Sequence, residues 1–550
     1  MFSKICIGLA LAIGASAGPN RPSTPIEVDV AIIGAGLAGA EVASLAASSG
    51  RTPTLFESRS TYGGRTQSVQ IGDYTLPKGG GWQQGTGRNH ALTKRIRECD
   101  IEVKGQNWNR WLDFCVNGTE CGDAWGDFEA AFACAESLAV EFGDYSVMSM
   151  ETGFRLCGWW AQSDDEFLVQ DSTVLFEWAE NPATLGLQYN LPWLTYAVHT
   201  DADNFFTDPR GAEEMAACWL DRYGVGREQS AQVNYNSRVV NIDSDAQVLT
   251  LANGTRYHYS VLFNTMPLGV MSWNLVKEEG SLFTPALPLS KQVALHGYHV
   301  PVYQKIYFQF PTAFWNAFSP NKEFFNIAPI APHQCTLWQN VDLNDGWLTD
   351  SRIIYLTCTS PQSTYAENLT EQQWTDVLMP ELRKVFGDDI PSPERVIISE
   401  WLSDPNFRGT FSNRPVESTP ERLDEFFAPM GADGTHIITG EAYCRNMNGF
   451  MHSAILAAET SWCEYQVRTG ERAADTPCRR IAVDADGEEL PNWCFDEGLE
   501  AFAKRSTTAV PRRARVAHSS LSAGEIDANA QIRIARALDI VSRLGEAPLE

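Results

Sequence analysis

The sequence predicts an α/β protein whose first domain is Rossmann-like. Two observations near the N-terminus predict it. VDVAIIGAGLAGAEVA, from Val28 to Ala43, is an apolar strand, a glycine turn and an alanine-rich helix. A second apolar strand, TPTLFES, follows and contains Glu57 near its end. This order of strand, glycine turn, helix and strand is typical of a Rossmann-like unit.

The glycine turn indicates what this unit binds. Gly34 permits a tight turn, Gly36 lets a pyrophosphate approach the backbone, and Gly39 lets the helix lie close to the strand. The helix N-terminus adds free N–H groups and a positive dipole for phosphates. Glu57 lies 23 positions after Gly34, where an acid binds a ribose hydroxyl. A structural glycine turn is the alternative, but this context favours dinucleotide binding.

The length, composition and charge of the chain limit the classes of protein to which it can belong. Its 550 residues are 44% hydrophobic, enough for a large core and two or more domains. The net charge of −27 argues against nucleic-acid binding through a basic surface. An acidic surface can gather cationic substrates, although the solubility of an exported protein also explains the negative charge. No cysteine or histidine cluster has zinc spacing, so we expect no metal.

The N-terminus predicts export. Residues 1–17 have the form of a signal peptide: Lys4, an apolar stretch from Ile5 to Ala15, and an A-x-A cleavage site ending at Ala17. The apolar stretch is too short to span a bilayer, and no later segment is long and apolar enough. We therefore expect a secreted protein without a membrane anchor.

Cysteines and sequons agree with export. Of 13 cysteines, only Cys6 lies in the signal, which leaves an even number that could form disulfides. Buried thiols are the alternative, and only Cys115 and Cys121, which flank a short loop, are an evident candidate pair. Three sequons could accept glycans; they begin at Asn117, Asn253 and Asn368.

Further segments extend the pattern along most of the chain. GGR (Gly63 to Arg65) follows Glu57, and TGEAYCRNMNGFMHSAILAAE runs from Thr439 to Glu459. With the glycine turn, these segments resemble the flavin-containing amine oxidase family, in which the arginine contacts the FAD phosphates. The resemblance is closest to secreted polyamine oxidases of the plant type. Other matching segments are KGGGWQQG (Lys78 to Gly85), SRVVNID (Ser237 to Asp243), NTMPLGV (Asn264 to Val270), VYQKIYFQFPTAFW (Val302 to Trp315) and WLSDPNFRGTFSN (Trp401 to Asn413).

The resemblance implies two discontinuous domains, a Rossmann-like FAD-binding domain and an α+β substrate-binding domain of the amine-oxidase type. The FAD-binding domain would comprise residues 27–86, 210–284 and 394–466. The substrate-binding domain would comprise residues 87–209 and 285–393. The resemblance stops near residue 469, and we expect residues 470–550 to form a mobile C-terminal extension.

The resemblance also implies site residues. Lys305 would be the catalytic side chain, holding a water near the flavin and assisting reoxidation by O2; a solvent-facing strand lysine is the alternative. Residues beside the substrate would be Trp82, Gln84, Tyr303, Phe411 and Phe450. Beyond Gly34, Gly36 and Gly39, residues beside FAD would be Glu57, Arg65, Gly80, Gly81, Trp82, Val239, Trp401, Glu441 and Met451.

One position departs from the resemblance. Where plant-type polyamine oxidases have a glutamate that holds a substrate ammonium, this chain has Gln84. The amide keeps the shape but forfeits charge assistance of about 1–2 kcal/mol. Phe450 likewise replaces a tyrosine. The alternative is that other acids, from the acid-rich stretch Asp164 to Asp171, supply the charge and that Gln84 is incidental.

The resemblance therefore implies a secreted oxidase with non-covalent FAD that uses a small amine and O2. It would oxidise a C–N bond by hydride transfer and give an imine and H2O2, with polyamines as one substrate class. The alternatives are a tailoring oxidase that acts on an amine-containing natural product and a flavin-binding protein without turnover. An L-amino-acid oxidase is disfavoured, because no arginine can be assigned to a substrate carboxylate.

Overall fold

The structure is a computed structural model of the chain. It describes residues 24–476 except 88–89, 108–109, 123, 143–147, 191–202, 277–281, 318–320, 329–334, 345–346 and 446, together with residues 478, 482–483, 489–490, 494 and 528–537. The expected signal peptide, residues 1–17, lies outside the described residues.

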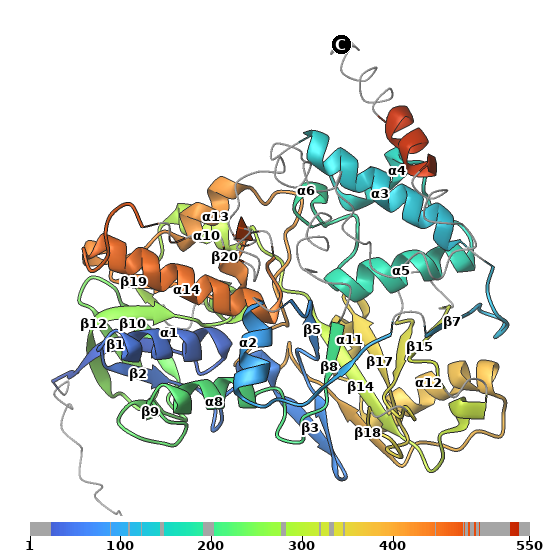
Figure 1. Cartoon of the computed structure of the whole chain (residues 1–550), viewed down its shortest axis with the longest axis horizontal. Helices are drawn as coiled ribbons and strands as arrows, with labels where there is room; N and C mark the ends of the chain where they lie inside the picture. The colour runs from blue at the N-terminus through green and yellow to red at the C-terminus, as the bar shows by residue number, and fades with distance from the viewer. Residues whose placement is uncertain are drawn as a thin grey trace, which may run out of the picture.

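The first domain is built on an eight-stranded mixed sheet with the predicted N-terminal unit at its centre (Figure 1). β1 pairs in parallel with a strand on each side. Its last four residues are buried, which explains why these four are all apolar rather than alternating. In spatial order the strands are β13 (Phe283–Thr284), β10 (Val239–Asp243), β11 (Val248–Leu251), β12 (Arg256–Asn264), β1 (Ile26–Ile33), β2 (Pro53–Phe56) and β9 (Val233–Asn234), and β19 (His436–Ile438) pairs with β12.

Helices cover both faces of this sheet. Val30 and Ile32 of β1 pack in one core with several helices, and Ala31 and Ile33 pack in a second core on the opposite face. The strand period of two sends alternate residues to these two cores. The first core includes α1 (Leu37–Ser48), α8 (Glu214–Arg222) and α14 (Met451–Arg468); the second includes α9 (Leu268–Val276), α10 (Leu289–Leu295) and α13 (Pro420–Phe427).

The second domain contains a six-stranded, mostly antiparallel sheet. Ile306 and Phe308 of its strand β14 pack in a core beneath α12 (Glu371–Phe386), whereas the hydroxyl of Tyr307 reaches the carbonyl of Pro77 in the first half of the chain. This alternation directs β14 residues of one parity toward the first domain. The strands are, in spatial order, β18 (Arg395–Ile398), β14 (Tyr303–Gln309), β17 (Ile353–Thr359), β16 (Leu337–Asn340), β15 (Phe324–Ile327) and β7 (Trp111–Phe114).

Smaller elements complete the second domain. Three helices, α3 (Trp125–Phe142), α4 (Met150–Leu156) and α5 (Asp164–Trp178), share one apolar core, and they lie above the six-stranded sheet in Figure 1. Between the two large sheets runs a short antiparallel sheet of β5 (Trp82–Gln84), β8 (Asp203–Phe206) and β6 (Val103–Gly105). β3 (Ser68–Ile71) and β4 (Tyr74–Pro77) form a hairpin.

The described parts of the C-terminal extension contact the body of the protein. Residues 528–537 form a helix whose Ala530 and Ala537 are buried, seen beside α4 in Figure 1. Its Arg533 donates hydrogen bonds to the Cys157 carbonyl and to Asp127. This helix therefore packs against the body of the protein, and the mobility of the extension stays a prediction. The rest of the extension lies largely outside the described residues.

All twelve cysteines after Cys6 form disulfides, among them the predicted pair of Cys115 and Cys121. The buried-thiol alternative is wrong for each of them. The other five pairs are Cys99–Cys218, Cys134–Cys157, Cys335–Cys358, Cys444–Cys494 and Cys463–Cys478.

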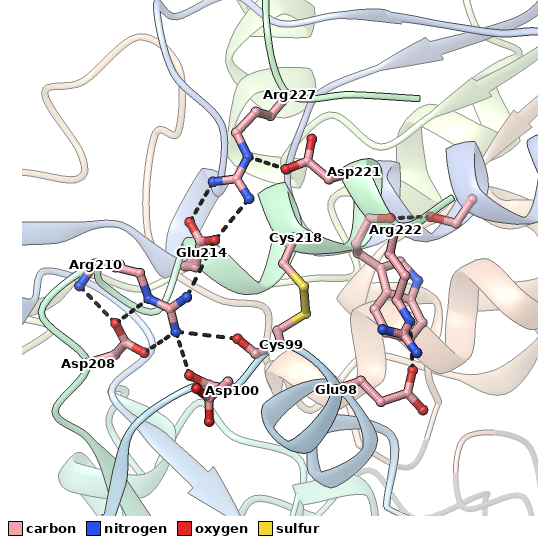
Figure 2. The surroundings of a disulfide bond; sticks show 12 residues. Glu98, Cys99, Asp100, Asp208, Arg210, Glu214, Cys218, Asp221, Arg222 and Arg227 are labelled. Atoms are coloured by element: carbon pink, nitrogen blue, oxygen red, sulfur yellow. Dashed lines mark hydrogen bonds and ion pairs between the residues drawn. A yellow bond between two sulfur atoms is a disulfide. The ribbon is translucent and has the colours of Figure 1, made fainter. Parts of the chain in front are cut away.

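The Cys99–Cys218 disulfide joins α8 to the end of α2 (Ala91–Glu98), as Figure 2 shows. Leu92 of α2 and Cys99 pack in the same core as α1. The structure thus attaches α2 to the first domain, beyond the boundary at residue 86 that the resemblance implied. The sequence hid this connection because its two ends lie 119 residues apart.

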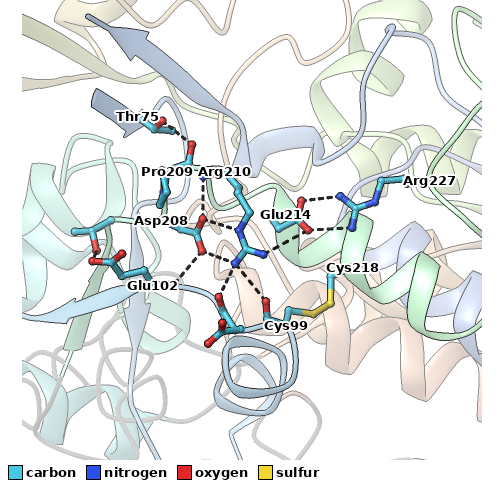
Figure 3. Close-up of polar contacts among 11 residues, drawn as sticks. Thr75, Cys99, Glu102, Asp208, Pro209, Arg210, Glu214, Cys218 and Arg227 are labelled. Atoms are coloured by element: carbon cyan, nitrogen blue, oxygen red, sulfur yellow. Dashed lines mark hydrogen bonds and ion pairs between the residues drawn. A yellow bond between two sulfur atoms is a disulfide. The ribbon is translucent and has the colours of Figure 1, made fainter. Parts of the chain in front are cut away.

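Ion pairs surround the same junction (Figure 3). Arg210 contacts both carboxylate oxygens of Asp208 at 2.9 and 2.7 Å and donates a hydrogen bond to the Asp100 carbonyl. Arg227 pairs with both oxygens of Glu214. These contacts connect the point where the chain re-enters the first domain with the turn that follows α2.

Candidate active site

A cavity of about 400 Å³ extends from the glycine turn of the first domain to aromatic side chains of the second. Fifteen of the seventeen site residues expected from the sequence line it; the exceptions are Gly39 and Lys305. The structure thus brings together segments more than 400 residues apart in the chain. The fifteen are Gly34, Gly36, Glu57, Arg65, Gly80, Gly81, Trp82, Gln84, Val239, Tyr303, Trp401, Phe411, Glu441, Phe450 and Met451.

The glycine turn has the geometry that a nucleotide cradle requires. Gly34 has a φ of +101°, a conformation that L side chains rarely adopt. A Cβ on Gly39 would lie 2.0 Å from the Gly34 carbonyl oxygen. Gly39 is therefore absent from the lining because it serves the expected packing of helix on strand.

Glu57, at the end of β2, is held by backbone groups. Its carboxylate accepts hydrogen bonds from the Ala35 N–H at 2.9 Å and the Arg59 N–H at 2.9 Å. Burial raises the pKa of Glu57, and these hydrogen bonds oppose the rise by favouring the charged form. The acid is thus fixed beside the glycine turn, where it can accept a hydrogen bond from a ribose hydroxyl.

Arg65 and Glu441 join the two expected flavin segments directly. The guanidinium Nη1 of Arg65 lies 2.9 Å from one Glu441 oxygen, and the other oxygen accepts hydrogen bonds from the Ser412 hydroxyl and the Gly449 N–H. Arg65 also donates to the Thr410 carbonyl. Glu441 is buried, so this pair forms part of the cavity floor rather than a solvated surface.

Several donors in the cavity fit an anionic dinucleotide. No side chain caps α1, which begins after Gly36, or α14, which begins at Met451, so the first N–H groups of both helices are open to a ligand. The indole N–H groups of Trp82 and Trp401 are buried without a hydrogen-bond partner among the described residues. A bound group would satisfy donors that the protein leaves free.

Aromatic rings form the opposite end of the cavity. The ring of Tyr303 lies 6.1 Å from that of Phe176 and 5.9 Å from that of Phe411. Phe176 also meets Trp82 edge to face at 5.8 Å. Phe450 is buried and lines the same space. Such a wall can exclude water and attract a cation to its ring faces.

Lys305 lies directly behind this wall. Its ammonium donates a hydrogen bond to the Gly79 carbonyl at 2.6 Å and lies 4.7 Å from the centroid of the Trp82 ring. The side chain is almost fully buried, so the solvent-facing alternative is wrong. Burial lowers the pKa of Lys305 to about 7, because an ammonium in an apolar environment loses its hydration.

Acids beside Gln84 were missed by the sequence analysis. Glu177 and Asp203 line the cavity with Gln84, and Asp203 accepts a hydrogen bond from the Gly85 N–H. The acid-rich stretch Asp164 to Asp171 does not line the cavity; it forms the first half of α5, and Glu177 lies near that helix's end. The sequence pattern that could have indicated Glu177 is its position between two aromatic residues, Phe176 and Trp178, at the end of a largely buried helix.

Other classes of site have no support in the described part of the chain. No group of three or more histidine, cysteine, aspartate or glutamate side chains there could hold a metal ion. Within the same residues, no helix is both long and apolar enough to cross a bilayer.

Comparison with protein families gives two matches. Residues 107–461 match a family described as flavin containing amine oxidoreductase, and residues 32–99 match an NAD(P)-binding Rossmann-like domain. The first match alone covers more than half of the chain.

Similar individual proteins agree with the family matches. The chain is 25% identical to polyamine oxidase 7 of Oryza sativa subsp. japonica, over 83% of this chain and 97% of that protein. It is 24% identical to polyamine oxidase 1 of Zea mays, over 85% and 97%. Among solved structures, putrescine oxidase bound to putrescine has a TM-score of 0.63 at 16% identity, covering 80% of this chain and 99% of that one. Cyclohexylamine oxidase from Brevibacterium oxydans has a TM-score of 0.62 at 16% identity, covering 81% and 100%.

Proposed function

The chain belongs to the family of flavin-containing amine oxidoreductases, and we propose that within it the protein is a secreted oxidase of small cationic amines. Membership makes it an FAD-dependent oxidoreductase that acts on amines. The alternative of a flavin-binding protein without turnover is therefore not retained. The expectations for the fold and the cofactor are confirmed by the same matches.

One observation carries the proposal: the nucleotide motifs and the aromatic wall line the same cavity, and a carboxylate, Glu177, stands at the aromatic end. A ligand at that end would meet rings on several sides and a negative charge. Amines that are protonated at neutral pH suit both features.

Each group in the cavity has a proposed task. The residues that line the nucleotide end would hold FAD, which would accept a hydride from the carbon beside nitrogen and pass its electrons to O2 to give H2O2, so that the amine would be released as an imine for hydrolysis. The chain orients the amine between Tyr303 and Phe411 and excludes water. Lys305, when protonated, places a positive charge behind the wall, which stabilises negative charge developing nearby. The free N–H groups at the start of α14 do the same from the other side.

Glu177 supports a substrate with a second cationic group. Gln84 offers an amide oxygen where the resemblance implied a carboxylate, so Glu177 becomes the acid best placed to hold a distal ammonium. Polyamines have this chemistry, and the relatives named above are polyamine oxidases. We therefore propose polyamine-type amines as the first substrate class to test.

A panel of amines tests this proposal. Peroxide release should be measured with spermine, spermidine, putrescine and a bulky hydrophobic monoamine. Turnover of at least one diamine or polyamine, with kcat/KM above that of the monoamine, is the expected result. Absence of turnover with every cationic amine would reject the proposed substrate class.

The second candidate is a tailoring oxidase that acts on an amine-containing natural product. Its supporting observation is that Gln84 and Phe450, both uncharged, line the cavity together with several aromatic rings. Preference for the bulky hydrophobic amine in the same panel would favour it.

The FAD should be bound without a covalent link. Cys444 lies within the C-terminal flavin segment, and its sulfur is bonded to that of Cys494. Purified protein should be yellow, and acid precipitation should release the colour into the supernatant. Flavin that stays with the precipitate would contradict this expectation.

Secretion is proposed on independent grounds. Twelve cysteines paired as six disulfides suit an oxidising compartment. The sequon residues Asn117, Asn253 and Asn368 are all exposed, so glycans could be accommodated. Mass spectrometry of protein from culture medium should show an N-terminus near residue 18 and a mass loss on treatment with an N-glycanase. Protein retained in the cytosol with residues 1–17 intact would reject this part.

A further inference from the structure

Glu367 is a buried acid outside the cavity lining whose carboxylate is fully committed to the backbone. It accepts hydrogen bonds from three consecutive amides, those of Trp401, Leu402 and Ser403; the latter two distances are 2.7 and 2.9 Å. Only 3% of the residue is exposed. A buried anion that satisfies three adjacent N–H groups fixes the conformation of that turn.

The first of these amides belongs to a residue of the cavity wall. Trp401 is buried and lines the cavity. Its ring atom Cζ2 lies 3.0 Å from the place where a Cβ on Gly79 would be, so indole and backbone are in close contact. The ammonium of Lys78 lies 4.8 Å from the ring centroid. Glu367 therefore fixes the backbone of an indole that presses on Gly79.

Gly79 in turn holds the proposed catalytic lysine. Its carbonyl accepts the 2.6 Å hydrogen bond from Lys305, and the neighbouring Pro77 carbonyl lies 3.4 Å from the same ammonium. We propose that Glu367 is a positioning residue for Lys305, acting through the Trp401 turn and the carbonyl of Gly79. This inference rests on the proposed role of Lys305 in reoxidation.

The segment around Glu367 is suited to this task. Glu367 follows α11 (Gln362–Ala366), and Ser363 of that helix donates a hydrogen bond to the Val302 carbonyl just before β14. The strand that carries Lys305 and the acid that fixes Trp401 therefore share one anchor. Strand β14 and the Trp401 turn are therefore restricted in moving relative to each other, and Gly79 lies in contact with a side chain of each.

The test is Glu367→Gln, with Glu323→Gln as the matched control. A glutamine replaces one acceptor oxygen by an NH2 group, which cannot accept a hydrogen bond from the backbone amides of this turn. Glu323 is equally buried and also accepts backbone amide hydrogen bonds, from Asn107, but it does not contact the cavity lining at Gly79 or Trp401. We expect Glu367→Gln to slow reoxidation of FAD by roughly tenfold in stopped flow, with little change for Glu323→Gln.

Two further readouts separate positioning from mere stability. The pH midpoint of reoxidation should move to lower pH in Glu367→Gln, because a weaker contact with the Gly79 carbonyl favours neutral Lys305. A crystal structure of the variant without FAD should show Trp401 displaced and the distance from Lys305 Nζ to the Gly79 oxygen lengthened. If Glu367→Gln is insoluble, Glu367→Asp, which keeps the charge but shortens the reach, should give the same changes at smaller size.

The outcomes are distinct from those of the proposed function. A lowered Tm with wild-type reoxidation, midpoint and Lys305 distance would overturn the positioning role. If Lys305→Met itself reoxidises at the wild-type rate, the role of Lys305 fails instead. In that case the crystallographic distance from Lys305 Nζ to the Gly79 oxygen alone would decide whether Glu367 positions Lys305.

Discussion

The two ends of the cavity are built from different parts of the polypeptide. The nucleotide end consists largely of backbone: the Gly34 turn, the amides that hold Glu57, and two uncapped helix starts. The amine end consists of side chains that come from β5, α5, β14 and the segments near residues 411 and 450. Backbone geometry leaves short local motifs in a sequence, whereas a wall of separate side chains leaves none.

This contrast predicts different responses to mutation. A change at the nucleotide end should abolish cofactor binding altogether, because every group there is shared by fold and ligand. A change at the amine end should leave FAD in place and alter one step of turnover or one class of substrate.

Gly39→Val should have the largest effect. Its Cβ would lie 2.0 Å from the Gly34 oxygen, an overlap with backbone that no rotamer relieves, so we expect a loss of at least about 3 kcal/mol in stability. The flavin-to-protein absorbance ratio and the Tm measure this. In the control, Gly105→Ala, the nearest atom would be 3.9 Å away. A yellow Gly39→Val protein with the wild-type Tm would refute the shared role of fold and ligand.

Lys305→Met should slow reoxidation by about 100-fold while FAD stays bound, because a preorganised positive charge is lost at a dry site. Stopped-flow traces that separate reduction from reoxidation measure this. Lys291→Met is the matched control: Lys291 is also buried, but it donates to backbone carbonyls at the end of α13. Equal reoxidation rates in wild type and Lys305→Met would assign Lys305 to structure.

Exchanging charge beside the substrate should have a smaller effect. Glu177→Gln should lower kcat/KM for spermine by roughly five- to thirtyfold, and Gln84→Glu should raise it by a similar factor, since each change removes or adds one charge-assisted contact of about 1–2 kcal/mol. Kinetics on a monoamine without a distal ammonium provide the control. If Gln84→Glu gives no gain while Glu177→Gln gives a loss, Glu177 alone supplies the charge.

An effect of similar, modest size is expected from pH. Because burial lowers the pKa of Lys305 to about 7, the side chain is charged below this pH and neutral above it. The reoxidation rate should therefore fall by about tenfold from one unit below the pKa to one unit above. The same profile in Lys305→Met should be flat. A wild-type profile without a step near neutral pH would contradict the assignment.

The nucleotide end could be predicted from residues alone. The apolar run before Gly34, the spacing to Glu57 and the alanine-rich helix each have a local physical meaning, and the structure agrees with them. Tyr303 and Phe411 could be assigned only through resemblance, because any aromatic residue in an apolar strand suits an ordinary core equally well.

Some features could not be predicted by either route. Glu177 lies in a helix whose other acids do not line the cavity, and only the packing of α5 near β14 shows which acid reaches it. The attachment of α2 to the first domain depends on a disulfide across 119 residues. The role of Glu367 is not visible in the sequence, because its hydrogen-bond partners are main-chain amides, which every residue type except proline has.

The Cys444–Cys494 disulfide makes the C-terminal region resistant to separation by proteolysis. A protease that cut the chain once between residues 479 and 493 would leave a two-chain molecule that migrates as one species until it is reduced. A cut at Arg512-Arg513, by contrast, would leave the helix of residues 528–537 held only by contacts such as those of Arg533. Gels run with and without reductant would therefore show which side of Cys494 a processing enzyme had reached.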